Sequence, residues 1–515
     1  MVKADKQDEQ QKKRRAKTVK ALLSNFISTT QGRVFSKDEI PLIIREDFEH
    51  YEGTIRQTGF RLLTSASHPD LLVQGEFMLL PYGKEMPTRA GAGGNRYSPP
   101  SVRRPIGIDL FAGAGGLSLG FEQAGFDIAA CVEIDPIHCA IHEYNFPYSA
   151  AICGSVTDLS GDEIRRRSGL VDRDIDVVFG GAPCQGFSLI GKRALDDPRN
   201  KLVFHYVRLI KELNPKYCVF ENVKGLTIGK HKQFLNELIA ALEKIGFHVA
   251  LPYHVLNAAD YGVPQNRHRL FLLAYRDGQF PLIYPVPAKR RVTVGEAIGD
   301  LPNVDQFETL LTSDAVSYCW KTEAAYARRL RLQVADSGDF SHPRVFNRDS
   351  LTCSLRTVHT EKSKARFMRA EAGTTEPVSR FFKLSSDGQC NTLRAGTDSA
   401  RGAFTSPRPI HPFEARVITV REAARLHSYP DWFRFHVTKW HGFRQIGNSV
   451  PPLLARAVAH EVVKALRVVP TKPPTPLPLG DPALLSFNMR QAADHFNVPA
   501  SVIGQRIRKK EKLCL

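Results

Sequence analysis

Short apolar runs alternate with helical patterns between about residues 106 and 275, and this alternation constrains the fold more than any other feature of the chain. The runs that read as buried strands are 106–110, 129–134, 175–179, 217–220 and 270–274. Between them, residues 202–213 and 234–245 each carry an apolar face with helical spacing, and Gly246 ends the second. Such alternation predicts an α/β fold with a doubly wound, mostly parallel, Rossmann-like sheet.

Reactive side chains stand at the ends of three of these runs. Pro183 and Cys184 follow the third run, Glu221 follows the fourth, and Arg267 and Arg269 precede the fifth. Strand ends are where α/β folds place their chemistry. A thiol, a carboxyl group and two guanidinium groups suit an enzyme that adds a thiolate to a pyrimidine ring.

Cys184 is the candidate nucleophile of that chemistry. Direct methylation of cytosine at carbon 5 is slow, whereas a thiolate added to carbon 6 turns carbon 5 into a nucleophile. Protonated Glu221 can donate to ring nitrogen 3 while its other oxygen accepts from the exocyclic amine, which selects cytosine over thymine. The ring must leave the base stack to be attacked in this way. An inert buried cysteine is the alternative for Cys184.

The two arginines and the segment after the cysteine complete this set. Arg267 and Arg269 can bind the ring carbonyl and orient the thiol loop or a phosphate, with surface ion pairs as the alternative. Residues 185–200 contain glycines and basic side chains, and they are expected to form a mobile lid that contacts phosphates.

A glycine-rich turn at Gly113, Gly115 and Gly116 follows the first run and opens a helix. Glycines there let the chain turn tightly and let a nucleoside approach main-chain amides. Glu133 ends the second run, about 20 residues further on, where an acidic residue can accept from ribose hydroxyls. A dinucleotide-binding oxidoreductase would have the same glycine-rich turn and strand-end glutamate, although this chain does not have its G-x-G-x-x-G motif.

Together these motifs resemble those of the cytosine-5 DNA methyltransferases. The matching segments are 109–116, Pro-Cys-Gln at 183–185, Glu-Asn-Val at 221–223, Gln-x-Arg-x-Arg at 265–269, Asn-Thr-Leu-Arg-Ala at 391–395 and Gln-Ile-Gly-Asn-Ser-Val-Pro at 445–451. The resemblance spans about 106–302 and 391–466. It implies a DNA (cytosine-5)-methyltransferase that uses S-adenosylmethionine, binds double-stranded DNA and reads its target with an inserted domain.

The resemblance also assigns cofactor contacts to the first half of the sheet. Phe111 is expected to cover the adenine, and Gly113 and Gly115 to lie under the methionine part. Glu133 is expected to hold the ribose, with Ile134 stacking beside it.

The remaining cofactor residues implied by the resemblance are dispersed along the chain. Asn448 and Val450, far downstream, are expected to complete the pocket. The family commonly has Gly-Asp in its third motif where this chain has a serine, so Asp158 is the candidate substitute. The other expected contacts are Asp109, Leu117, Ser155 and Pro183.

Changes in composition divide the chain into six expected segments. These are an N-terminal module of unknown role (1–86), a linker (87–105), the catalytic and cofactor-binding domain (106–302), the target-recognition domain (303–409), the C-terminal part of the catalytic domain (410–469), and a Pro-rich linker with a basic tail (470–515). The target-recognition segment mixes arginines with phenylalanines, which suits groove and phosphate contacts. The tail faintly resembles a helix-turn-helix, but a plain solvated helix is favoured.

The composition is consistent with a nucleic-acid partner, with a soluble basic enzyme as the alternative. Lys and Arg number 71 against 53 acidic residues, and the net charge of +18 favours a polyanionic partner. The nine cysteines form no C-x-x-C pair, which is typical of a reducing cytoplasm. His138 and His142 have i, i+4 spacing, but no third metal ligand accompanies them, so no metal is expected. We expect no membrane span and no signal peptide.

The expected setting is a prokaryotic cytoplasm, at the nucleoid, with the protein acting as a monomer on DNA. A restriction system is the expected context, with a cognate restriction endonuclease as a functional partner. Three alternatives stay open from the sequence: an RNA cytosine-5 methyltransferase, a non-catalytic DNA-binding regulator with the same fold, and an NAD-dependent oxidoreductase.

Overall fold

The structure is a computed structural model, and it describes residues 34–36, 40, 60–64, 76–81, 101–182, 201–229, 231–396 and 408–503. The chain divides into two compact units, Met1–Pro100 and Ser101–Leu515. Among the described residues, no helix is both long and apolar enough to span a membrane. Pro183, Cys184 and the rest of 183–200 lie outside the described residues.

The described strands of the first unit form a small antiparallel sheet. β3 (Glu76–Pro81) lies between β1 (Val34–Ser36) and β2 (Phe60–Thr64).

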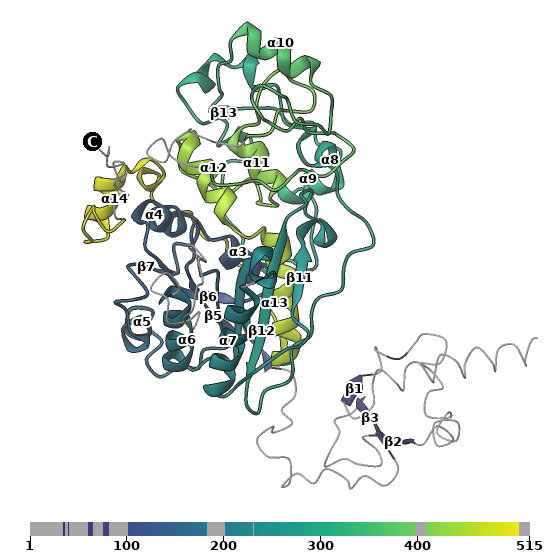
Figure 1. The fold of residues 1–515 in the computed structure, drawn as a ribbon, viewed down its shortest axis with the longest axis vertical. Helices are drawn as coiled ribbons and strands as arrows, with labels where there is room; N and C mark the ends of the chain where they lie inside the picture. The colour runs from purple at the N-terminus through teal and green to yellow at the C-terminus, as the bar shows by residue number, and fades with distance from the viewer. Residues whose placement is uncertain are drawn as a thin grey trace, which may run out of the picture. The chain divides into compact units, whose positions relative to one another are not determined.

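The second unit is built on an eight-stranded sheet (Figure 1). Its strands are β5 (Ile106–Leu110), β6 (Asp127–Glu133), β7 (Ala150–Cys153), β8 (Val177–Gly180), β9 (Tyr217–Val223), β10 (Phe247–Val249), β11 (His254–Asn257) and β12 (His268–Arg276). They follow the order β10-β12-β9-β8-β5-β6-β7, with β11 also paired to β12. From β9 to β7 every pairing is parallel, whereas β12 runs antiparallel to β9. The predicted doubly wound, mostly parallel sheet is confirmed.

Two of the predicted strand ends are wrong by a few residues, and the difference bears on the site. β9 continues to Val223, so Glu221 lies inside the strand, and β12 begins at His268, so Arg269 lies inside it too. The antiparallel register between them explains the extension, because it pairs Phe271 with Glu221 and Arg269 with Val223. The side chains of Glu221 and Arg269 are therefore positioned by regular strand geometry.

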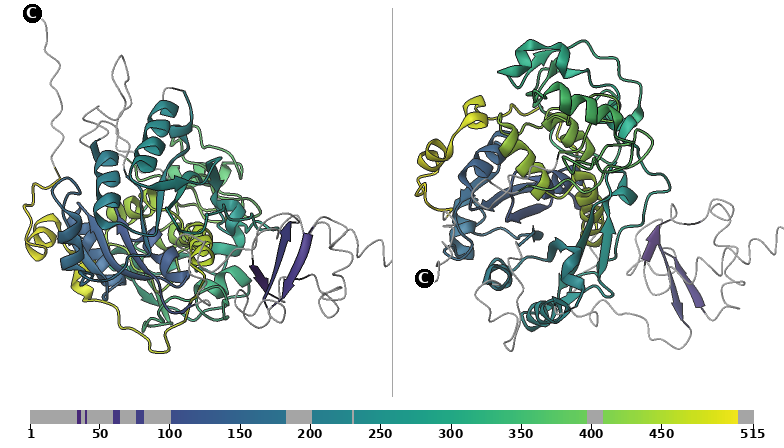
Figure 2. Two further views of the ribbon diagram at one scale, coloured as in Figure 1. Left: turned by 90° about the horizontal axis from the view of Figure 1, so that it is seen from below. Right: turned by 45° about the horizontal axis from the view of Figure 1, so that its top comes forward.

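Helices cover both faces of this sheet, as Figures 1 and 2 show. They are α3 (Gly116–Gln123), α4 (Pro136–Asn145), α5 (Gly161–Arg167), α6 (Lys201–Leu213), α7 (His231–Lys244) and α13 (Pro452–Leu466). Alternate residues of β8 face opposite sides: Val177 and Phe179 join the core under α3 and α13, and Val178 joins the core under α6 and α7. Both faces are buried, which is why these strands read as continuous apolar runs.

The predicted helices α6 and α7 are confirmed. α7 ends at Lys244, and the next glycine, Gly246, has a left-handed φ of +87°. α13 has prolines at its start, where a missing N–H costs nothing.

Residues 294–396 and 408–449 mostly form short elements at the carboxyl end of the sheet, at the top of Figure 1. The helices are α8 (Val294–Ile298), α9 (Ala325–Leu330), α10 (Glu361–Arg369), α11 (Val420–Leu426) and α12 (Lys439–Asn448). The strands are β13 (Val316–Ser317) and β14 (Ser350–Leu351). This part also contains the 3-10 turns η8 (Val304–Gln306) and η9 (Glu308–Leu311), and two further turns, η6 (Lys224–Thr227) and η7 (Ala258–Tyr261), connect elements of the main sheet.

The chain after α13 returns across the molecule. β15 (Val468–Val469) pairs in parallel with β4 (Ser101–Val102), and η11 (Pro482–Ser486) and α14 (Met489–His495) then lie on α4. The prediction of a plain solvated helix in the tail is wrong, because the side chains of Ala492 and Ala493 are fully buried.

Candidate active site

The glycine-rich loop leaves β5 and enters α3 with an unusual backbone. Phe111 has a φ of +66°, and its N–H donates to the Val132 carbonyl at 2.9 Å. Gly113 and Gly115 also have positive φ, at +55° and +95°. Glycine is the residue that adopts such angles at least cost, so the loop conformation explains why glycine is placed here.

The glycines of this loop face different surroundings. A Cβ on Gly115 would lie 2.6 Å from the Phe146 ring, and one on Gly116 would lie 2.4 Å from the Val450 carbonyl oxygen. A Cβ on Gly113, by contrast, would meet no atom within 4 Å. The loop is therefore packed tightly on its inner side and open at Gly113.

Glu133 holds the open part of the loop. Its Oε2 accepts from the Gly113 N–H at 2.8 Å, and its Oε1 accepts from the N–H groups of Ile134 and Asp135 at 3.0 and 2.9 Å. Ile134, beside it, is 39% exposed although it is a large apolar side chain. A carboxylate at a strand end, an open glycine and an exposed apolar side chain thus lie together at one rim.

The loop after β7 lies next to this rim, because the Gly154 N–H donates to the Glu133 carbonyl at 2.9 Å. Ser155 Oγ lies 2.7 Å from Thr157 Oγ1, which donates to Asp158 Oδ1 at 2.8 Å. Asp158 is exposed. The structure therefore places the loop that carries Ser155 and Asp158 next to the Glu133 rim.

The last motif approaches the loop from the far end of the sequence. α12 ends at Asn448, which is exposed, and Val450 is buried with its carbonyl against Gly116. α13 then packs so closely on α3 that a Cβ on Gly120 would lie 2.3 Å from the Ala455 Cβ. This close helix contact brings residues 448–450 to the glycine loop.

Two of the expected cofactor residues lie behind the loop instead of at its open side. Leu117 is 6% exposed and belongs to the core under α3. Asp109 is fully buried, and its Oδ2 accepts from the Ser118 N–H at 3.1 Å and from the Ser118 Oγ at 2.6 Å. Burial raises the pKa of Asp109 to about 8. Both residues therefore shape the loop from within the core.

His142 belongs to the same buried group as Asp109 and Ser118. Its Nε2 lies 3.0 Å from Ser118 Oγ, and because that hydroxyl donates to Asp109, Nε2 is the donor here. Burial lowers the pKa of His142 to about 3, so the ring is neutral. His138 lies 3.8 Å from Asp135. No cluster of three or more potential metal ligands occurs among the described residues.

The chemical end of the site lies where β8, β9 and β12 meet. Arg269 Nε and Glu221 Oε1 are 2.9 Å apart, and both side chains are nearly buried. A Cβ on Gly181 would lie 2.6 Å from Glu221 Oε2, so glycine leaves the space that this carboxyl group occupies. Asn222 Nδ2 donates to the Ala182 carbonyl at 3.0 Å. These contacts hold Glu221 directly against the chain that leads to Cys184.

Burial raises the pKa of Glu221, and the charges of Arg269 and Arg267 oppose this shift. Desolvation is the largest cause, so the neutral carboxyl group is favoured more than in water. A carboxyl group with a raised pKa in a site of this kind is suited to donate a proton.

Arg267 has a different environment from Arg269. Its side chain is 1% exposed, and its guanidinium donates to the carbonyls of Leu393, Gly447 and Ser449 at 2.8, 2.9 and 2.8 Å. The structure therefore separates two residues that the sequence groups together. Arg269 faces Glu221, and Arg267 joins backbone segments that are remote in the sequence.

Residues that sequence reasoning missed support Arg267. Gln265 Oε1 accepts from the Leu393 N–H at 3.0 Å, and its Nε2 donates to His427 Nδ1 at 2.9 Å. His427 Nε2 therefore carries the ring proton and donates to the Ser449 carbonyl at 3.1 Å. The partners are mostly backbone carbonyls, which leave no signal in residue types. Gly181 could have been found, because a glycine pair precedes the cysteine motif.

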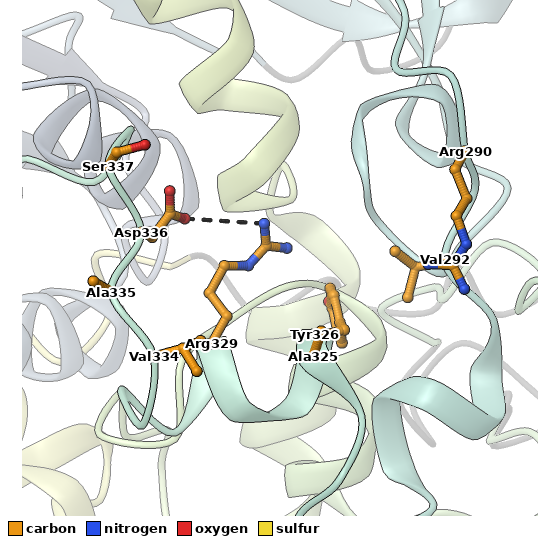
Figure 3. A pocket seen from close by; sticks show the side chains of 9 residues that line it. All are labelled: Arg290, Val292, Ala325, Tyr326, Arg329, Val334, Ala335, Asp336 and Ser337. Atoms are coloured by element: carbon orange, nitrogen blue, oxygen red, sulfur yellow. Dashed lines mark ion pairs between the residues drawn. The ribbon is translucent and has the colours of Figure 1, made fainter.

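A separate pocket lies among the arginines near α9 (Figure 3). Arg329 and Asp336 point toward one another across it, with 3.9 Å between their charged groups, and Arg456 lies 2.8 Å from the same carboxylate. Arg290 is paired with Glu296 at 2.6 Å. These charges are compensated within the protein, and the pocket contains none of the residues expected to react.

Comparison with known proteins supports the same chemistry. The family model for the C-5 cytosine-specific DNA methylase matches residues 107–464. The type II methyltransferase M.XorII of Xanthomonas oryzae pv. oryzae is 61% identical over 411 residues, which cover 80% of this chain and 97% of that protein. The type II methyltransferase M1.HphI of Haemophilus parahaemolyticus is 36% identical over 361 residues, covering 69% and 86%.

Among solved structures, the following example is similar in both fold and sequence. It is described as a DNA modification methyltransferase encoded within a prophage of E. coli. The match has a TM-score of 0.59 and 32% identity, and it covers 70% of this chain and 99% of that one.

Proposed function

The chain belongs to the C-5 cytosine-specific DNA methylase family, and from that premise we propose how its residues divide the work of DNA (cytosine-5) methylation. The observation that carries the assignment is the Arg269–Glu221 pair beside Gly181. It puts a carboxyl group with a raised pKa at the strand end from which the Pro-Cys-Gln motif continues.

Cys184 is the nucleophile in this proposal. Its sulfur forms a bond to carbon 6 of a cytosine that has left the base stack, and carbon 5 thereby becomes nucleophilic. S-adenosylmethionine, when bound, supplies the methyl group. Removal of the proton on carbon 5 then restores the ring and breaks the bond to sulfur. The need for a thiolate that adds to carbon 6 explains why a cysteine occupies this position.

Glu221 acts as the proton donor at ring nitrogen 3. Its raised pKa favours the protonated form, and the Arg269 guanidinium fixes one of its oxygens at 2.9 Å. A fixed, protonated carboxyl group can donate to nitrogen 3 of cytosine but not to thymine, whose nitrogen 3 carries a hydrogen. Arg269 also supplies donors for the ring carbonyl. Arg267 acts as a positioning residue, because its two terminal guanidinium nitrogens donate to backbone carbonyls.

The residues of the glycine loop fit a nucleoside cofactor. Gly113 leaves open space, Glu133 presents a carboxylate at the end of β6, and Ile134 exposes an apolar surface beside it. We assign the ribose to Glu133 and the adenine to the surfaces of Phe111 and Ile134.

The other residues of the cofactor pocket act at its edges or behind it. Asn448 and Val450 close the side formed by the last motif, and Ser155 and Asp158 border the adenine side. Pro183, outside the described residues, is assigned to the pocket by the motif alone. Asp109 and Leu117 act indirectly, by holding the loop from within the core.

Double-stranded DNA is the proposed partner, acted on by a monomer in a prokaryotic cytoplasm. The net charge of +18 favours a polyanion, and basic side chains are dense in the proposed target-recognition segment, 303–409. Both relatives described above are named type II methyltransferases, which supports a role in a restriction–modification system with an endonuclease of matching target.

Covalent trapping tests the proposal directly. Purified protein, S-adenosylmethionine and a mixed-sequence duplex with 5-fluorocytosine should give a protein–DNA adduct, since fluorine at carbon 5 cannot be removed as a proton. Peptide mapping should place the adduct at Cys184. Methylation of transfer RNA in place of duplex DNA, or an adduct at another residue, would contradict the proposal. Bisulfite sequencing of DNA from an expression host lacking 5-methylcytosine would then reveal the target sequence.

A further inference from the structure

Residues 477–496, which we name the C-terminal strap, have no role in the function proposed above. The strap begins at Leu477, whose N–H donates to the Pro343 carbonyl at 2.8 Å and whose carbonyl accepts from Val345 at 2.9 Å. It then reaches α4, where the Gly480 N–H donates to the Tyr144 carbonyl at 2.8 Å. A Cβ on Gly480 would lie 2.8 Å from the Tyr144 Cα, so the two backbones are in direct contact.

The middle of the strap packs behind the glycine loop. Leu484 and Leu485 are each 3% exposed, and they share one apolar cluster with Ala114 and with residues of α4. Ala114 lies between the two glycines with positive φ, and α4 begins directly after Glu133, Ile134 and Asp135. The strap thus supports the side of the proposed cofactor pocket that carries the ribose and adenine contacts.

The same part of the strap is also bonded to the segment that leads into α12. The Val437 N–H donates to the Leu485 carbonyl at 3.0 Å. His436 Nδ1 accepts from the Thr438 N–H at 3.1 Å, so Nε2 carries the proton and donates to the Phe487 carbonyl at 3.1 Å. His436, Val437 and Thr438 directly precede α12, and α12 ends at Asn448.

The end of the strap is fixed to α4 as well. α14 buries Ala492 and Ala493 against it, and His495 Nε2 lies 3.2 Å from both carboxylate oxygens of Glu143. In Figures 1 and 2, α14 lies beside α4 in each view.

We infer that the C-terminal strap is a positioning element of the cofactor pocket, which holds the glycine-loop side and the Asn448 side in register. The inference rests on the proposed function. The pocket is assembled from segments that are remote in the sequence, and its loop has a strained backbone. A support shared by both sides reduces the free energy needed to order them when the cofactor binds.

The test uses full-length variants and the binding of S-adenosylhomocysteine, measured by calorimetry, with DNA binding as a second reading. Leu485→Ala and His436→Leu should each weaken S-adenosylhomocysteine binding by about tenfold. Their affinity for a mixed-sequence duplex should stay within about twofold of wild type. His436→Gln, which keeps a donor at the position of Nε2, should restore cofactor binding.

Leu242→Ala is the matched control, because Leu242 is equally buried but lies in α7 on the other face of the sheet. Unchanged binding in both strap variants would overturn the inference, and so would an equal loss in Leu242→Ala. If Leu485→Ala does not fold, the comparison of His436→Leu with His436→Gln tests the inference. Equal affinity of these two variants for S-adenosylhomocysteine would overturn the inference. Failure of wild-type protein to bind S-adenosylhomocysteine would instead contradict the proposed cofactor.

Discussion

The guanidinium of Arg269 and the carboxyl group of Glu221 are joined across two antiparallel strands, with 2.9 Å between Nε and Oε1. Glu221 has a raised pKa in spite of this cation, because burial outweighs the attraction. The pair therefore combines a fixed orientation with a carboxyl group that keeps its proton more readily than in water. This combination is what the proposed protonation of cytosine nitrogen 3 requires.

Replacing the nucleophile should separate chemistry from binding. Cys184→Ala is expected to abolish methyl transfer, because no other group can form the bond to carbon 6. The affinity for duplex DNA should stay largely intact. Tritium transfer from labelled S-adenosylmethionine and an electrophoretic mobility shift measure the two properties. Residual transfer at a substantial fraction of the wild-type rate would exclude Cys184 as the nucleophile.

The role of Glu221 predicts a particular pH dependence. If protonated Glu221 is the donor, kcat should fall as pH rises through its pKa, which lies above the ordinary 4.5. Removing the opposing charge with Arg269→Ala should move this alkaline limb to higher pH while lowering kcat. Glu221→Gln should lower kcat by about 10²–10⁴-fold and remove the limb. Profiles of kcat against pH check this, and an unmoved limb in Arg269→Ala would argue against it.

Gly181 should be needed for activity because of the space it leaves. In Gly181→Ala the new methyl group would lie 2.6 Å from Glu221 Oε2, so the carboxyl group must move. A displacement of this size is expected to lower kcat by about a hundredfold. Gly388→Ala is the control, since its Cβ would meet its nearest neighbour at an ordinary 3.5 Å. Equal activity of the two variants would show that this contact is unimportant.

The two arginines of one motif should respond differently to lysine. Lysine cannot reproduce the three bonds that Arg267 donates to the carbonyls of Leu393, Gly447 and Ser449. Arg267→Lys is therefore expected to lower the free energy of unfolding by about 3 kcal/mol. Arg269→Lys should lower kcat with little loss of stability. Urea unfolding and methyl-transfer kinetics test both, and a reversed pattern would exchange the proposed roles.

Asp109 predicts a dependence of stability on pH. Its pKa is raised by burial from 3.8 to about 8, so the folded chain keeps a proton that the unfolded chain loses above its own pKa. The stability contributed by the neutral group is full at acidic pH and is lost as pH rises toward that value. The free energy of unfolding of Asp109→Asn should therefore rise relative to that of wild type between about pH 5 and pH 8, by up to about 1.4 kcal/mol per pH unit.

Asp135→Asn is the matched control for Asp109→Asn, because its pKa is lowered and its contribution is lost only as pH falls below the ordinary carboxyl range. Its difference from wild type should stay constant over the same interval. Urea unfolding at several pH values measures both differences. A constant difference for Asp109→Asn would show that its buried carboxyl group is charged when folded.

The sequence by itself determined the sheet, its main helices and the order of the reactive motifs. Strands such as 106–110 are buried on both faces, so their apolar runs are continuous and easily recognised. The cofactor loop is also recognisable from the sequence. The backbone angles at Gly113 and Gly115 restrict the choice of residue to glycine, and a glutamate follows at the end of the next strand.

Only the tertiary structure decided how these motifs divide their work. Arg267 and Arg269 are two residues apart in the sequence, but one joins distant backbone carbonyls and the other faces Glu221. The tail reads as solvated because its apolar residues are few, yet Leu484, Leu485 and Ala492 are buried against α4. Residue types record a local preference for water or for helix, whereas a contact depends on which remote segment the fold brings alongside.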